Sequence, residues 1–179
     1  MSKEDTISKK NIYNGSIIKL DLHEVILENN HITKREVISH NGGVGVLPID
    51  KDGQIVLVRQ FRKPFESETL EIPAGKRDKA ELPEKCAERE LLEETGIIAG
   101  KMKLLAEMYP SPGYTNETVY IFEAEELTYG TAAPDEDEFI SVFRCSLEEA
   151  YQLVTSGGIK DAKTIIAITM AVNERLRKI

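Results

Sequence analysis

The sequence contains few of the residues that cross-link small proteins or bind zinc. Only two cysteines, Cys86 and Cys145, occur in the 179 residues, and they form neither a CxxC pair nor a disulfide framework. The three histidines show no spacing that is typical of a zinc site. A disulfide-rich scaffold and a zinc-binding module are therefore excluded, and we expect Cys86 to serve packing within a helix.

Long hydrophobic runs and an excess of positive charge are also missing. No apolar run is long enough to span a bilayer and no signal peptide is recognisable, so we expect a cytoplasmic protein. The 31 acidic residues outnumber the 23 basic ones, and the formal net charge is −8. This charge disfavours nucleic-acid polymers and anionic membranes as partners. It leaves room for a small anionic substrate that arrives with a metal ion.

The composition that remains is that of a globular protein with one main domain. Hydrophobic residues make up 41% of the chain, enough for a core, and charged residues 30%. Repeats, low-complexity tracts and an interdomain linker are absent. Glycines 42 and 43 separate residues 1–41, which we expect to form an N-terminal β unit, from a main domain at 42–179.

The apolar pattern predicts the elements of both parts. Residues 1–10 are polar and expected to fray, whereas 16–27 and 32–39 alternate as two antiparallel strands around a turn. In the main domain we expect strands at 44–49, 54–60, 70–72, 103–109, 119–124 and 139–144, and helices at about 83–95, 147–156 and 161–177. Ser146 and Glu149 form a capping box for the second helix. This order predicts an α+β fold with a mixed sheet covered by helices.

The helix between Pro83 and Gly96 is unusually rich in carboxylates. Proline suits a first helical turn, and glycine suits the left-handed position that ends a helix. On charge alone, a solvated acidic face is the usual interpretation. Yet Glu90, Glu93 and Glu94 share one face, and like charges at i,i+4 weaken a helix. Their clustering suggests a compensating cation, and hard oxygen ligands suit Mg²⁺ or Mn²⁺.

The carboxylates belong to an ordered pattern. Gly75 is followed after five residues by Glu81, and after seven more by the run Arg89-Glu90-Leu91-Leu92-Glu93-Glu94-Thr95-Gly96-Ile97. This pattern resembles the Nudix box at every defining position. The resemblance covers about residue 42 to the C-terminus and implies an α/β/α sandwich with a mixed sheet.

Features outside the box resemble the ADP-ribose pyrophosphatase branch of that family. Pro112, within Ser111-Pro112-Gly113, lies fifteen residues past Ile97. The segments 35–37, 59–62 and 70–75 are also similar to that branch. The resemblance implies metal-dependent hydrolysis of ADP-ribose to AMP and ribose 5-phosphate. Alternatives are a Nudix hydrolase of a nucleotide sugar or an oxidised nucleotide, a non-catalytic nucleotide-sensing module, and an interaction protein with an acidic helix.

The resemblance also implies roles for individual residues. The metal ligands are expected to be Glu90, Glu94, the backbone carbonyl of Ala74 and Glu138. Glu93 is close enough to join them and is assigned, with Glu136 as the general base, to catalysis. Glu136 and Glu138, which lie in an acidic loop, could exchange these roles. Arg89 is expected to orient a box glutamate through an ion pair rather than to touch the substrate.

Substrate contacts are expected from residues outside the helix. Arg62 is a candidate for gripping a diphosphate through paired N–H donors, and Pro112 belongs to a rigid loop near the substrate. The resemblance implies a homodimer in which the N-terminal strands of one subunit help to form the adenine site of the other. In that arrangement Tyr13 could stack on adenine and Arg35 could contact the nucleotide.

Overall fold

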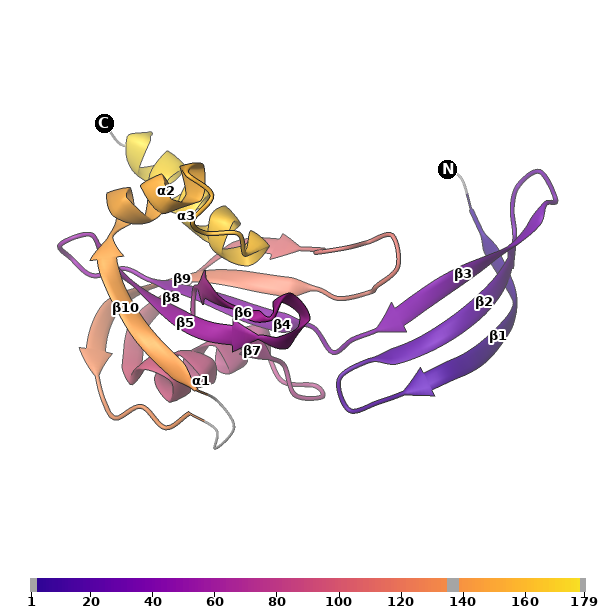
Figure 1. Cartoon of the computed structure of the whole chain (residues 1–179), viewed down its shortest axis with the longest axis horizontal. Helices are drawn as coiled ribbons and strands as arrows, with labels where there is room; N and C mark the ends of the chain where they lie inside the picture. The colour runs from indigo at the N-terminus through magenta and orange to yellow at the C-terminus, as the bar shows by residue number, and fades with distance from the viewer. Residues whose placement is uncertain (1–2, 135–138, 178–179) are drawn as a thin grey trace. The chain divides into compact units, whose positions relative to one another are not determined.

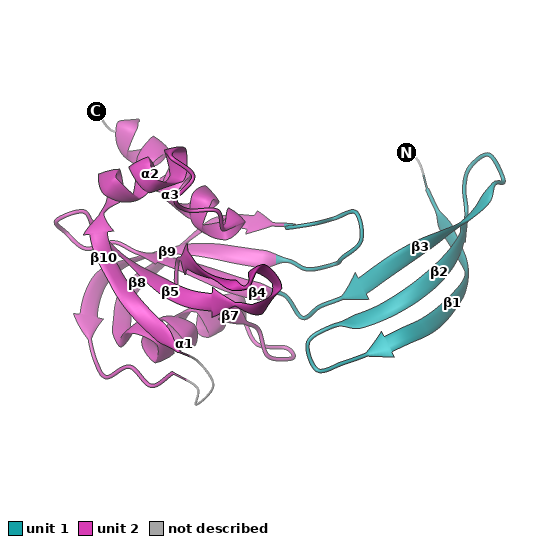
Figure 2. Cartoon of the chain, in the orientation of Figure 1, with its two compact units in different colours: residues 1–42, 109–118 teal, residues 43–108, 119–179 magenta. Residues whose placement is uncertain are grey.

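The computed structural model describes residues 3–134 and 139–177. Figure 1 shows the elements along the chain. Contacts divide the chain into two units, drawn in two colours in Figure 2. Unit 1 comprises Met1–Gly42 and Tyr109–Thr118, and unit 2 comprises Gly43–Met108 and Val119–Ile179. No helix in the described ranges is long and apolar enough to cross a membrane.

Unit 1 is a three-stranded antiparallel sheet. Its strands are β1 (Asp5–Asn14), β2 (Lys19–Ile26) and β3 (Ile32–Ser39), in the order β1-β2-β3. The expectation of fraying is therefore wrong for residues 5–10. All residues of β1 are exposed, so the strand carries no alternation of buried apolar side chains from which it could be recognised. Its backbone pairing with β2 orders it instead.

A buried carboxylate fixes the register of the first two strands. Asp21 is almost completely buried and accepts a hydrogen bond of 2.9 Å from the side-chain amide of Asn11. The Asn11 amide also donates to the backbone carbonyls of Tyr13 and Leu20. The pairing register shifts between Asn11 and Tyr13, as in a β-bulge. These bonds hold the backbone that carries Tyr13.

The loop that contains Pro112 joins unit 1. The Ile38 N–H, near the end of β3, donates to the Tyr114 carbonyl at 2.7 Å, and the Asn116 N–H donates to the Ile38 carbonyl at 3.1 Å. This segment lies more than 70 residues after β3 in the chain, yet it continues the pairing of that strand. Pro112 itself is exposed.

Unit 2 contains two sheets and three α-helices among its described residues. One sheet has the order β10-β5-β6 and the other the order β7-β4-β9-β8, with β4 and β9 parallel and the remaining pairs antiparallel. The bounds are β4 (Gly43–Pro48), β5 (Gln54–Arg62), η1 (Lys63–Phe65), β6 (Ser67–Glu71), β7 (Ala74–Lys76), α1 (Pro83–Thr95), β8 (Ile97–Met108), β9 (Val119–Tyr129), β10 (Ile140–Ser146), α2 (Leu147–Thr155) and α3 (Ala162–Leu176). The predicted α+β fold with a mixed sheet is confirmed.

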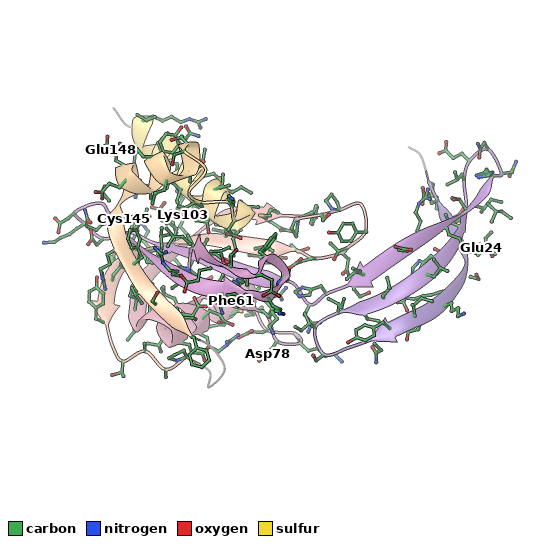
Figure 3. All side chains as sticks on the ribbon, in the orientation of Figure 1. Glu24, Phe61, Asp78, Lys103, Cys145 and Glu148 are labelled. Atoms are coloured by element: carbon green, nitrogen blue, oxygen red, sulfur yellow. The ribbon has the colours of Figure 1, made fainter. Side chains whose placement is uncertain are left out.

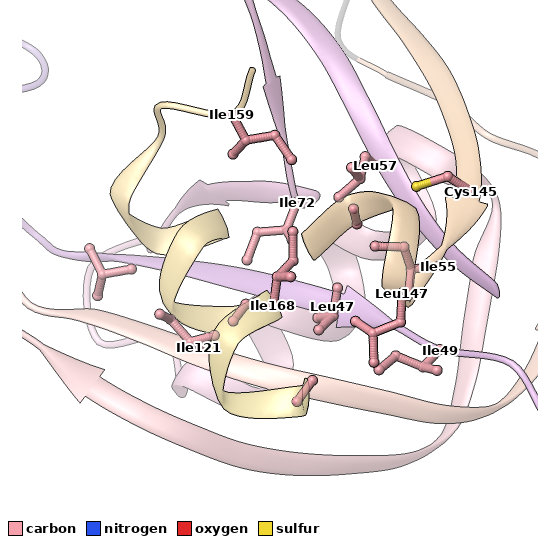
Figure 4. Close-up of a cluster of buried hydrophobic side chains, with 14 residues drawn as sticks. Leu47, Ile49, Ile55, Leu57, Ile72, Ile121, Cys145, Leu147, Ile159 and Ile168 are labelled. Atoms are coloured by element: carbon pink, nitrogen blue, oxygen red, sulfur yellow. The ribbon is translucent and has the colours of Figure 1, made fainter. Parts of the chain in front are cut away.

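Side chains on the two faces of the central strands belong to two different hydrophobic cores. Val44 and Val46 of β4 pack with Cys86 and Leu91 of α1, whereas Leu47 belongs to the core that includes α2 and α3. Figure 4 shows this second core, and Figure 1 shows α2 and α3 on the opposite side of the strands from α1. Neighbouring side chains of a strand point to opposite faces. The sequence of a strand that is covered on both faces is therefore one continuous apolar run. This is the predicted α/β/α sandwich.

The helix termini follow the local sequence signals. Ser146 accepts from the N–H of Glu149, whose carboxylate accepts from the N–H of Ser146, so the predicted capping box at α2 is confirmed. The Asp161 carboxylate caps α3 by accepting from the N–H of Thr164 at 3.0 Å. Strand β8 is longer than predicted because it begins directly after Gly96 and pairs with β9 along nearly its whole length.

The orientation of α1 can be tested with two neighbouring leucines. Leu91 is fully buried and Leu92 is partly exposed. We expect Leu91→Ala to lower the free energy of unfolding by about 2–5 kcal/mol, because it leaves a cavity between the helix and the sheet. Leu92→Ala should cause a clearly smaller loss. Urea denaturation of both variants measures the difference, and equal losses would contradict the described helix face.

Candidate active site

The site begins where a strand passes through a short loop into helix α1. Pro83 occupies the first helical turn, and Gly96 ends the helix with a positive φ of 71° while its N–H donates to the Leu92 carbonyl at 2.8 Å. Both boundaries are those predicted. The preceding loop is held by its own hydrogen bonds: the Asp78 N–H donates to the Glu81 carboxylate at 2.9 Å, and the guanidinium of Arg77 donates to the Glu81 carbonyl. Asp78 is labelled in Figure 3.

Two glutamates of α1 lie on its buried side. Glu90 is 8% exposed and Glu94 is 4% exposed, and they share that side with the apolar core residues of the helix. One helical turn separates them. Burying two carboxylates so close together is costly unless positive charge or hydrogen bonds compensate it. The residues around them provide part of that compensation.

The backbone of β7 lies directly against both carboxylates. A Cβ atom built on Gly75 would lie 1.9 Å from the carboxyl carbon of Glu90, so any side chain at this position would have to displace that carboxylate. The N–H of the preceding residue, Ala74, donates to the carboxylate of Glu94 at 3.0 Å. The glycine of the motif therefore has a packing role here: it admits the carboxylate to the backbone.

Arg89 connects three acidic side chains. Its guanidinium donates to both oxygens of Glu81 at 3.1 Å, to Glu90 at 2.8 Å and to Glu93 at 2.9 Å. These bonds lower the pKa of Glu81 to about 2 and raise the pKa of Arg89 above its ordinary value. The predicted ion pair between Arg89 and a box glutamate is confirmed. Glu93 lies at the partly exposed edge of this network rather than beside Glu94 on the buried side.

The donor set fits a small divalent cation. Carboxylate oxygens are the ligands that Mg²⁺ and Mn²⁺ prefer, and Mg²⁺ often takes only one or two of them while keeping several waters. Within residues 3–134 and 139–177, no three acidic, histidine or cysteine side chains gather closely enough to hold a metal ion by themselves. Glu90 and Glu94 would thus supply the carboxylate pair, and backbone, water or substrate oxygens would complete the shell.

Arg62 lies in a second charged network, which no motif in the sequence predicts. It follows Phe61, labelled in Figure 3, at the end of β5 and forms a two-bond pair with the buried Glu71, with both N···O distances 2.8 Å. Lys163 of α3 also donates to Glu71. Glu71 and Lys163 were missed because they lie 92 residues apart in the chain and belong to no motif with a fixed spacing.

The other predicted substrate residues lie in unit 1. Tyr13 is exposed, and its ring lies against Gly15, where a Cβ atom would approach it to 2.6 Å. Arg35 of β3 donates to both carboxylate oxygens of Glu4 at 2.7 and 3.0 Å. Pro112 belongs to the loop paired with β3. The predicted general base Glu136 and the predicted ligand Glu138 lie outside the described residues.

The contact between Gly75 and Glu90 gives a direct test. We expect Gly75→Ala to displace the Glu90 carboxylate, because the added methyl group would occupy its place. Wild-type protein should gain thermal stability on addition of Mg²⁺, as a folded protein does when a ligand binds only its native state. The variant should lose most of that gain in a thermal-shift titration. Gly113→Ala is the matched control, since a Cβ there meets nothing within 4 Å; a full Mg²⁺ response in Gly75→Ala would contradict the described contact.

Comparison with known proteins places this geometry in a family. A model of the NUDIX domain matches residues 39–167. An ADP-ribose pyrophosphatase of Bacillus subtilis (strain 168) is 46% identical over 168 residues, 93% of this chain and 91% of the relative. A methanol dehydrogenase activator of Bacillus methanolicus is 40% identical over the same shares. A solved structure described as an ADP compounds hydrolase shares the fold, with a TM-score of 0.85 at 21% identity over 98% of this chain and 95% of that chain. The chain belongs to the Nudix family.

Proposed function

We propose that this protein hydrolyses the diphosphate bond of ADP-ribose to give AMP and ribose 5-phosphate, using Mg²⁺ or Mn²⁺. The observation that carries the proposal is the pair of buried carboxylates, Glu90 and Glu94, held against the backbone of β7. Family membership supports the reaction class. The similarity to an ADP-ribose pyrophosphatase along 93% of the chain supports the substrate.

The bound cation would neutralise charge on the diphosphate and make water a better nucleophile. In the proposed reaction the oxygen of water forms a new bond to one phosphorus, and the bridging oxygen leaves with the other phosphate. Glu90 and Glu94 would hold the cation, together with the carbonyl of Ala74. Arg89 keeps Glu90 in place and also binds Glu93, which would assist catalysis from the edge of the site.

The remaining catalytic roles fall to the acidic loop. We assign Glu136 as the general base that takes the proton of the attacking water and Glu138 as an additional metal ligand. Both lie outside the described residues, and their place in the chain supports the assignment. Arg62 would bind the diphosphate, since a guanidinium offers donors in a planar fork that suits phosphate oxygens.

Product analysis tests the reaction. The purified protein, incubated with ADP-ribose and Mg²⁺, should release AMP and ribose 5-phosphate in equal amounts, as measured by chromatography. Glu94→Gln should lower kcat by at least about a hundredfold, because it removes a ligand of the ion that stabilises the transition state. Glu84→Gln, on the exposed first turn of the same helix, is the matched control and should keep full activity.

The same assay separates the two loop glutamates and the competing substrates. Excess Mg²⁺ should restore part of the activity of Glu138→Gln, because that variant lacks a metal ligand. It should restore no activity to Glu136→Gln, because that variant lacks the general base. If folded wild-type protein leaves ADP-ribose intact but cleaves a nucleotide sugar or an oxidised nucleotide, the substrate assignment is wrong. If it cleaves none of them, a nucleotide-sensing module becomes the better interpretation.

We also propose that the protein is a homodimer joined through its N-terminal strands. Every residue of β1 is exposed in the single chain, and Ile7, Ile12 and Tyr13 are each more than half exposed. Apolar side chains exposed along a whole strand favour association. In such a dimer, Tyr13 and Arg35 would contribute to the adenine site of the other subunit, and the Pro112 loop would border the substrate.

Sedimentation equilibrium tests the dimer. At micromolar concentration we expect one species with about twice the 20.1 kDa mass of the chain. Replacing Ile7 and Ile12 together by Asn should shift the distribution toward the single chain, because the interface would then bury less apolar surface. A monomer across the whole concentration range, in a protein that turns over substrate, would contradict the proposal.

A further inference from the structure

Glu71, at the end of β6, is a buried carboxylate with an unusual number of partners. It is 3% exposed. It accepts two hydrogen bonds from Arg62, one from the hydroxyl of Thr69 and one from the ammonium of Lys163. Burial by itself would raise the pKa of Glu71, but the hydrogen bonds and charges of Arg62 and Lys163 lower it to about 2. Glu71 is therefore a carboxylate anion at neutral pH and joins two cations from separate elements.

The position of Lys163 is unfavourable for helix α3 alone. It lies in the first helical turn, where the helix dipole disfavours a positive charge. Its side chain is mostly buried, and it donates to Asp161, the cap of the helix, at 3.0 Å as well as to Glu71. A cation placed against the local preference and buried there indicates a requirement from the tertiary structure. That requirement is the charge of Glu71.

The network is connected to the carboxylate pair of α1. Thr164, next to Lys163, accepts the Ile72 N–H through its hydroxyl at 2.8 Å and donates to Asp161 at 2.6 Å. Two residues beyond Ile72, the Ala74 N–H binds Glu94. Three residues of chain span at most about 11 Å, so Glu71 lies close to the proposed metal site. In agreement, the hydrogen bonds to Glu71 raise the pKa of Arg62, and the carboxylate of Glu94 acts in the same direction.

We propose that Glu71 is a positioning residue that holds the Arg62 guanidinium toward the diphosphate of the substrate, beside Glu90 and Glu94. The Glu71 carboxylate accepts hydrogen bonds from Nε and Nη2 of Arg62, which fixes the orientation of the planar guanidinium. Nη1 is not part of this pair. Lys163 and Asp161 balance the remaining charge and anchor the network to α3. The inference rests on the proposed function, because it needs an anionic substrate at this site.

A double-mutant cycle on KM tests the inference. Glu71→Gln keeps the shape of the side chain but removes its charge, so Arg62 loses its fixed orientation. We expect KM for ADP-ribose to rise about tenfold with kcat changed less than about threefold, as for a contact made equally in the ground and transition states. Arg62→Ala should raise KM by at least as much. Adding Glu71→Gln to Arg62→Ala should raise it no further, because Glu71 acts through Arg62.

The control is an exposed glutamate on the same strand as Glu71. Glu68 of β6 faces Arg59 of β5 at 4.0 Å and its side chain is 62% exposed, so Glu68→Gln should leave both constants unchanged. If Glu71→Gln does not fold, Glu71→Asp keeps the charge yet shortens the side chain, and the same rise in KM is expected. Thermal unfolding of each variant records its stability separately from its kinetics.

The outcomes distinguish this inference from the proposed function. A purely structural role predicts a lower unfolding temperature with unchanged KM, or effects of Glu71→Gln and Arg62→Ala that add; either result overturns the inference. Wild-type protein that neither cleaves ADP-ribose nor binds its methylene-diphosphonate analogue in calorimetry overturns the proposed function and this inference with it. Active wild-type protein with an unchanged Glu71→Gln variant overturns the inference alone.

Discussion

The burial of two carboxylates on one helix is the constraint on which the rest of this site depends. Glu90 and Glu94 lie on the side of α1 that packs against the sheet, where apolar side chains would be the cheaper choice. The backbone of β7 must approach closely, and Gly75 permits this because it has no Cβ atom. The buried side of the helix and the strand before it are thus organised around negative charge that a folded protein would otherwise avoid.

Charge compensation around this pair is distributed over two networks. Arg89 joins Glu81, Glu90 and Glu93 on the helix itself, and Glu71 gathers two cations from β5 and α3. Removing a partner of the buried Glu71 leaves its charge without compensation, which costs more than the pair contributed. Charge and burial together therefore hold the Arg62 side chain in one orientation. The proposed binding of a cation and a diphosphate would benefit from this rigidity.

Local signals predicted much of this arrangement, and long-range contacts account for what they missed. The bounds of α1 and the capping box at Ser146 depend on residues within a few positions of each other, and the structure has them as expected. The network of Glu71 and Lys163 joins positions 92 residues apart, and β1 is ordered by backbone pairing rather than by an apolar pattern. Helical spacing alone placed Glu93 on the face of Glu90, whereas Arg89 holds it at the edge.

Anomalous diffraction from crystals grown with Mn²⁺ shows whether Glu90 and Glu94 bind the cation, because it locates the ion without reference to catalysis. We expect an anomalous peak within coordination distance of the carboxylates of both Glu90 and Glu94, about 2.0–2.2 Å from their oxygens. The peak should be absent from crystals of Glu94→Gln grown under the same conditions. A strong peak elsewhere, with none at this pair in wild-type protein, would show that the buried carboxylates serve the fold and not the metal.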